Sequence, residues 1–130
     1  MVLATESALC IAGNREVVEQ VNHPKMRVLM DADNGVWSGA YNAADMVRGL
    51  RDALCNVAHA KDGLKDHPDN VLIGEGDGDF PATAEALKEI GFDGTIMCES
   101  DYSNETEACT AADLATLKRI FGNFRETVSL

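Results

Sequence analysis

Residues 55–59, Cys-Asn-Val-Ala-His, form a short apolar run that ends in a histidine. Three other apolar runs end in an acid in the same way: VLATE at residues 2–6, MRVLMD at 26–31 and GTIMCE at 94–99. Short runs that are apolar on both faces are typical of parallel strands covered by helices. A buried acid is costly unless it is paired or coordinates a cation, so acids that recur at strand ends indicate a functional site.

The segments between these runs have the apolar spacing of helices, and strands that alternate with helices predict an α/β fold with about five parallel strands. The predicted strands are Val2–Thr5, Met26–Met30, Asn56–Ala60, Val71–Ile73 and Thr95–Cys98. The predicted helices are Asn14–Val21, Ala43–Leu54, one that Asp79 caps and Gly91 ends, and one from about Ala111 to Phe121. We expect long loops at Asp31–Asn42, Lys61–Asn70 and Glu99–Ala108, and a loosely held tail at Asn123–Leu130.

Composition limits the function classes. The 130 residues are enough for one domain, residues 1–130, with a modest core. A net charge of −11 without a basic cluster makes nucleic acid an unexpected partner. No apolar run approaches the roughly 20 residues of a membrane span, and the start MVLATESALC does not predict a signal peptide. Four cysteines without a Cys-x-x-Cys pair predict free thiols and a cytoplasmic setting.

The residues at the strand ends are ligand types for a hard cation. In parallel α/β folds the chemistry collects at the C-terminal ends of the strands, so these side chains should meet. Three carboxylates and one imidazole form an oxygen-rich divalent-metal site. Taken singly, each acid is better interpreted as a solvated loop residue or a helix cap than as a metal ligand. The predicted ligands are Glu6, Asp31, His59 and Glu99, with Asp33 as a competing choice in the second segment.

Five motifs in order resemble the xylose isomerase-like TIM barrels, the sugar phosphate isomerase/epimerase superfamily. His59–Gly63 resembles that family's HxKDG strand end, and Gly74–Pro81 (GEGDGDFP) resembles its GEGxxDFP segment. Gly91–Gly94 followed by Glu99 resembles its GYxG…E ending. Leu29–Asn34 resembles its LDxxN/H segment, and Val2–Ser7 its earlier strand that ends in glutamate.

The resemblance implies isomerisation or epimerisation of a hydroxy-ketone in a small carbohydrate. A divalent metal would stabilise an enediolate. Mn²⁺ or Mg²⁺ suits this role best, and Co²⁺ or Zn²⁺ is also suited. Glu6 and Glu99 would remove and return the carbon-bound proton while also touching the metal, and Asp31 and His59 would hold the ion. Proposed substrate contacts are Asn34, Trp37, Lys61 and Lys65, with solvated or loop-covering roles as the alternative.

The family barrel has eight strands in about 250 residues, so this chain resembles its second half, a partial (β/α) barrel. Two open sheet edges and an uncovered inner face would be liabilities in water. We therefore expect a homo-oligomer or a partner chain that completes the barrel. The alternative to an enzyme is a non-catalytic or truncated half-barrel that binds metal or self-associates without turnover. A relative of the DNA-acting endonuclease IV branch of the barrel is the least favoured interpretation, given the charge and only four candidate ligands.

Overall fold

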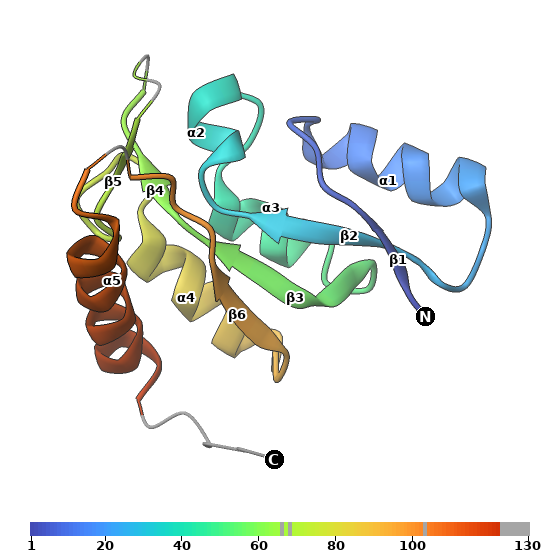
Figure 1. The fold of residues 1–130 in the computed structure, drawn as a ribbon. Helices are drawn as coiled ribbons and strands as arrows, with labels where there is room; N and C mark the ends of the chain where they lie inside the picture. The colour runs from blue at the N-terminus through green and yellow to red at the C-terminus, as the bar shows by residue number, and fades with distance from the viewer. Residues whose placement is uncertain (66, 68, 103, 123–130) are drawn as a thin grey trace.

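The computed structural model describes residues 1–65, 67, 69–102 and 104–122. Its main sheet has four strands in the order β1-β2-β3-β6, and every neighbouring pair is parallel (Figure 1). These strands are β1 (Leu3–Thr5), β2 (Met26–Asp31), β3 (Leu54–Ala60) and β6 (Thr95–Cys98). The α/β class with parallel strands is therefore confirmed, and the main sheet of the described residues has four strands where about five were expected.

The predicted strand at residues 71–73 is not part of the main sheet. Residues Asn70–Val71 form β5, which pairs antiparallel with β4 (Asp62–Gly63) in a separate two-stranded ribbon. The side chain of Ile73 enters the core, and its backbone N–H donates to the Asp113 carboxylate instead of a strand. A run of three apolar residues is too short to outweigh these contacts. In addition, β6 pairs directly with β3, which leaves no gap between them for another strand.

The helices begin and end at slightly different residues from those predicted. The five helices of the described chain are α1 (Ile11–Val21), α2 (Asn34–Ser38), α3 (Ala43–Gly49), α4 (Phe80–Glu89) and α5 (Thr106–Phe121). The predicted loop at 31–42 therefore contains a short helix, and the last helix begins five residues earlier than expected. The predicted helix Ala43–Leu54 ends early because Leu50 closes it and a turn leads into β3. The predicted loose tail, 123–130, lies outside the described residues.

The core lies between the sheet and the helices α3 and α4, which are behind the sheet in Figure 1. Asp79 caps α4 as predicted, because its side chain accepts a hydrogen bond from the Ala82 backbone N–H, and Pro81 lies in the first turn. The core side chains from β2, α3 and α4 are nearly inaccessible to solvent and include Val28, Met30, Met46, Val47, Leu50, Ala84 and Leu87. This packing holds β2 and β3, which carry the two buried residues of the predicted site.

The opposite face of the sheet is open. Register pairs His59 with Asp31 and with Met97, so these three side chains share one face, and none is part of the buried hydrophobic cluster. Met97 is 46% exposed there. Within the described residues, β1 and β6 each pair on one side only. No helix of this described part is long and apolar enough to cross a membrane.

Candidate metal centre

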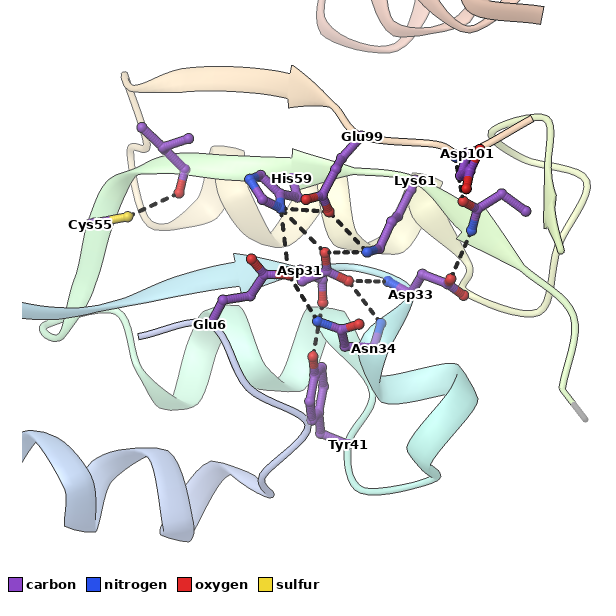
Figure 2. Close-up of polar contacts among 12 residues, drawn as sticks. Glu6, Asp31, Asp33, Asn34, Tyr41, Cys55, His59, Lys61, Glu99 and Asp101 are labelled. Atoms are coloured by element: carbon purple, nitrogen blue, oxygen red, sulfur yellow. Dashed lines mark hydrogen bonds and ion pairs between the residues drawn. The ribbon is translucent and has the colours of Figure 1, made fainter. Parts of the chain in front are cut away.

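The four predicted ligands converge at one end of the sheet. Each ends or follows a different strand of the order β1-β2-β3-β6, which places all of them at the C-terminal edge. One possible ligand atom from each residue lies within 4.8 Å of the others, and Figure 2 shows the side chains pointing toward a common centre. The members of this quartet are Glu6, Asp31, His59 and Glu99.

The imidazole nitrogen Nδ1 of His59 is the meeting point of the carboxylates. It lies 2.9 Å from Glu99 Oε2, 3.4 Å from Asp31 Oδ2 and 3.7 Å from Glu6 Oε1. The side chains of Asp31 and His59 are only 1% and 8% exposed, whereas those of Glu6 and Glu99 are 35% and 41% exposed. The quartet therefore has a buried half and an open half.

The backbone holds the Asp31 side chain through one of its two oxygens. Its Oδ1 accepts hydrogen bonds from the backbone N–H groups of Asp33 and Asn34, at 3.0 and 2.8 Å. Its Oδ2 and the Nδ1 of His59 are buried and form no hydrogen bond of good geometry, although Oδ2 lies 3.0 Å from Lys61 Nζ and Nδ1 lies 2.9 Å from Glu99 Oε2. A coordinated cation would give both atoms a direct partner. The residues therefore fit a divalent metal.

Lys61 supplies the positive charge among these acids. Its Nζ lies 2.9 Å from Glu99 Oε2 and 3.0 Å from Asp31 Oδ2. Partial burial opposes the charged form of Glu99, but the hydrogen bond and charge of Lys61, with His59, hold the Glu99 pKa below its usual range. Burial likewise works against the Lys61 ammonium, and Glu99 and Asp31 outweigh it, so the Lys61 pKa is raised. Both groups stay charged near neutral pH.

Two further residues support the quartet from α2 and the loop after it. Asn34 Nδ2 donates to Glu6 Oε1 at 3.1 Å, and the Tyr41 hydroxyl donates to the Asp31 carbonyl oxygen at 3.0 Å. Burial and the nearby charge of Asp31 raise the pKa of Tyr41, so its hydroxyl keeps the proton that it donates. Sequence reasoning missed Tyr41, because it is ten residues from Asp31 and outside every motif.

The four predicted substrate contacts separate into two groups. Asn34 and Lys61 contact members of the quartet directly. Trp37 is 69% exposed on α2. Lys65 lines a hollow of about 420 Å³ whose walls include Tyr41 and Asp77 but no member of the quartet. Asn34 and Lys61 therefore stand where a molecule held at the quartet would meet them, whereas substrate contact by Trp37 and Lys65 stays a prediction.

Asp62 is the organising acid of the glycine-rich segment, and sequence reasoning assigned it no role. It is fully buried, and its two oxygens accept hydrogen bonds from four backbone N–H groups at 2.9–3.1 Å. The donors are Gly63, Gly74, Gly76 and Gly78. A Cβ built on Gly76 would lie 2.3 Å from Asp62 Oδ1, so glycine is required for this approach. The every-second-residue spacing of glycines from 74 to 78 is the signal that could have revealed it.

Comparisons with known proteins identify the family. The family described as the xylose isomerase-like TIM barrel matches residues 4–120, so the chain belongs to this family. The 2-epi-5-epi-valiolone 7-phosphate 2-epimerase of an Actinoplanes species is 34% identical over 128 residues, which cover 98% of this chain and 47% of that protein. The predicted family is thereby confirmed.

Solved structures show the same fold. A xylose isomerase domain protein from Planctomyces limnophilus superposes with a TM-score of 0.79 at 22% identity, covering 92% of this chain and 45% of that one. The structure of an IolI protein with a zinc atom has a TM-score of 0.65 at 22% identity, covering 82% and 41%. The chain thus spans about half the length of the epimerase and less than half of each of these two structures.

Proposed function

We propose that this chain carries the metal site of an isomerase or epimerase that acts on a sugar, a sugar phosphate or a keto-polyol by enediolate proton transfer, as part of an assembly. The observation that carries the proposal is the quartet, in which four ligand atoms from four strands lie within 4.8 Å of one another. The similarity to a sugar phosphate epimerase along 98% of the chain supports the same reaction class.

The burial of the quartet supports a division of roles. Asp31 and His59 are the buried members, Asp31 is oriented by two backbone N–H groups, and both would hold the ion. Glu6 and Glu99 are the open members and come from strands at opposite edges of the sheet. Two carboxylates placed in this way can remove a proton from one side of a substrate carbon and return it from another. Lys61 would keep Glu99 ionised, as a base must be.

The donor set also supports the choice of metal. Three carboxylates and one imidazole suit Mn²⁺ or Mg²⁺ best, and Co²⁺ or Zn²⁺ are also compatible with it. The bound ion would supply electrophilic stabilisation of negative charge that develops on the substrate oxygens. Asn34 and Lys61, which already contact the acids, would bind substrate hydroxyls or a phosphate from the side of β2 and β3.

The open edges of the sheet support an assembly, and the cysteines support a cytoplasmic location. A closed barrel of this class has eight strands, whereas the main sheet of the described chain has four and pairs β1 and β6 on one side only. A second copy, or a partner chain with the remaining strands, would pair with these edges and cover the face that bears Met97. The four free cysteines are consistent with the reducing cytoplasm.

One observation favours a second candidate function. The quartet needs only this chain, whereas a complete substrate pocket needs walls on both sides, and the face that bears His59 and Met97 is open. A half-barrel that binds metal or self-associates without turnover would have the same structure.

The experiment that separates the two is exchange of the substrate proton with solvent. The purified, Mn²⁺-loaded chain is incubated in D₂O with D-fructose and with fructose 6-phosphate, and deuterium at the carbons beside the carbonyl is measured by NMR. The proposal predicts exchange that Glu99→Gln and Glu6→Gln abolish. Glu75→Gln is the matched control, because Glu75 is an exposed glutamate outside the quartet. Metal binding without any exchange would favour the non-catalytic half-barrel.

A further inference from the structure

A single side chain, that of Asn70, contacts the segments that follow three of the four predicted ligands. Its Nδ2 donates to Asp33 Oδ2 at 3.0 Å and to the Asp62 carbonyl oxygen at 3.3 Å, and its Oδ1 accepts from the Asp101 backbone N–H at 2.7 Å. Asp33 is two residues after Asp31, Asp62 three after His59, and Asp101 two after Glu99.

From this arrangement we infer that Asn70 is a positioning residue, which fastens together the loops after β2, β3 and β6 and so sets the distances between the metal ligands. The inference rests on the metal site proposed above. In the described part of the chain the side-chain hydrogen bonds of Asn70 go to Asp33, Asp62 and Asp101, so its effect on the four ligands has to pass through these residues.

The path from Asn70 to Asp31 is short and continuous. Asn70 holds the Asp33 carboxylate, and the backbone N–H of Asp33 donates to Asp31 Oδ1 at 3.0 Å. That bond, with the bond from Asn34, leaves the other oxygen, Oδ2, facing the quartet, 3.4 Å from His59 Nδ1 and 3.0 Å from Lys61 Nζ. A side chain that holds Asp33 in place therefore also holds the candidate ligand atom of Asp31. Partners of this outer kind orient metal ligands in many proteins.

The chemistry of the amide suits three loops at once. An asparagine side chain offers two N–H donors and one carbonyl acceptor, and all are used here by different segments. Asn70 also pairs with Gly63 through the β4–β5 ribbon, which fixes its backbone. Gly63 in turn leaves room for Asp33, because a Cβ at position 63 would lie 2.3 Å from Asp33 Oδ1. The β4–β5 ribbon therefore fixes the backbone from which the Asn70 amide reaches the three loops.

The first test needs no metal. Amide hydrogen exchange is measured on the metal-free chain, on Asn70→Ala and on Asn104→Ala, an exposed asparagine in the loop that follows Glu99. Asn70→Ala is expected to speed exchange at the amides of Asp33, Asn34 and Asp101, and Asn104→Ala is expected to leave those of Asp33 and Asn34 unchanged. A purely local role for Asn70 would alter Asp101 alone and would overturn the inference.

A second variant separates the contacts and protects the test against misfolding. Asn70→Asp keeps an acceptor for the Asp101 N–H but places a carboxylate against that of Asp33, where the amide had donated. It is expected to speed exchange at Asp33 and Asn34 while Asp101 remains protected. Parental exchange at Asp33 and Asn34 in this variant would contradict the inference even if Asn70→Ala did not fold.

The metal gives the second readout. With folding checked by circular dichroism, Asn70→Ala is expected to bind Mn²⁺ about tenfold more weakly than the parent chain, as outer partners of metal ligands commonly do when removed. Asn104→Ala should bind like the parent. Parental Mn²⁺ affinity in folded Asn70→Ala would overturn the inference. If the parent chain itself binds no Mn²⁺, the proposed function fails, whereas the exchange measurements still decide the role of Asn70.

Discussion

The carboxylates of Glu6 and Glu99 both reach the Nδ1 atom of His59, although the two acids follow strands at opposite edges of the sheet. Glu6 Oε1 lies 3.7 Å and Glu99 Oε2 2.9 Å from that nitrogen. The sheet order β1-β2-β3-β6 places two further strands between them. Twist and curvature of parallel strands bring the edges toward one another at the C-terminal end, as in a barrel mouth. A site built in this way depends on the whole sheet.

Gly63 is predicted to be intolerant of a side chain. A Cβ there would lie 2.3 Å from Asp33 Oδ1, so Gly63→Ala must displace the Asp33 carboxylate. We expect a loss of about 1–3 kcal/mol in the free energy of unfolding, measured by urea denaturation. Gly13→Ala in α1 is the matched control, because its Cβ would come no closer than 3.3 Å to Leu9. Equal stability of the two variants would contradict this prediction.

The buried carboxylate of Asp113 is predicted to depend on Tyr102. The Tyr102 hydroxyl hydrogen-bonds to Asp113 Oδ2, and Asp113 Oδ1 accepts from the Ile73 backbone N–H at 2.9 Å. Tyr102→Phe leaves a buried carboxylate with one partner fewer and should cost about 1–3 kcal/mol in unfolding free energy. Ser100→Ala, which removes only a 3.4 Å contact to the same carboxylate, should cost less. A neutral Tyr102→Phe would show that this pair does not stabilise the fold.

The exposed pair of Arg48 and Glu89 joins α3 to α4 and predicts a pH effect. The hydrogen bond from Arg48 holds the pKa of Glu89 below its ordinary value. The folded state therefore binds this proton less readily than the unfolded state, so the pair adds stability above about pH 4.3, and that contribution is lost as the pH falls through the folded pKa. NMR titration should show a depressed Glu89 pKa that returns to the ordinary range in Arg48→Gln. The same Glu89 pKa in both proteins would disprove the assignment.

Self-association through the open face is predicted to depend on Met97. This side chain is 46% exposed on β6 and shares a face with His59. In sedimentation velocity at micromolar concentration we expect the chain to form an oligomer, and Met97→Lys to shift it toward monomer because the charge would be buried at the interface. Leu114→Lys on α5, where the leucine is also 46% exposed, is the control. A monomeric parent chain would contradict this prediction. Completion of the barrel by a partner chain would then be the only assembly left.

The positions of the strand ends could be predicted because the signals are local. His59 and Asp31 each close an apolar run, and the motifs around Gly74–Pro81 and Gly91–Gly94 give the order of the elements. The cap at Asp79 followed from its own neighbours in the chain in the same way. These features predicted the α/β class, the family and the meeting of the four side chains at one edge. Their role as ligands remains a prediction.

What could not be predicted depends on contacts between distant residues. The β4–β5 ribbon forms because Asp62 gathers N–H groups 12 to 16 residues away, which removes Val71–Ile73 from the sheet. Asn70 contacts Asp33 and Asp101 across 37 and 31 residues, so its role has no local signature. Helix α3 ends at Gly49 although its apolar spacing continues to Leu54, because a turn that begins at Leu50 connects the helix to β3.

The most direct test of the account is a Mn²⁺ titration by calorimetry on the purified chain after removal of metal with a chelator. The account predicts binding of one ion per chain, lost in His59→Ala because the atom on which the three carboxylates converge is removed. His23→Ala, which changes an exposed histidine outside the quartet, should bind like the parent. Absence of binding in the parent, or unchanged binding in His59→Ala, would contradict the metal centre.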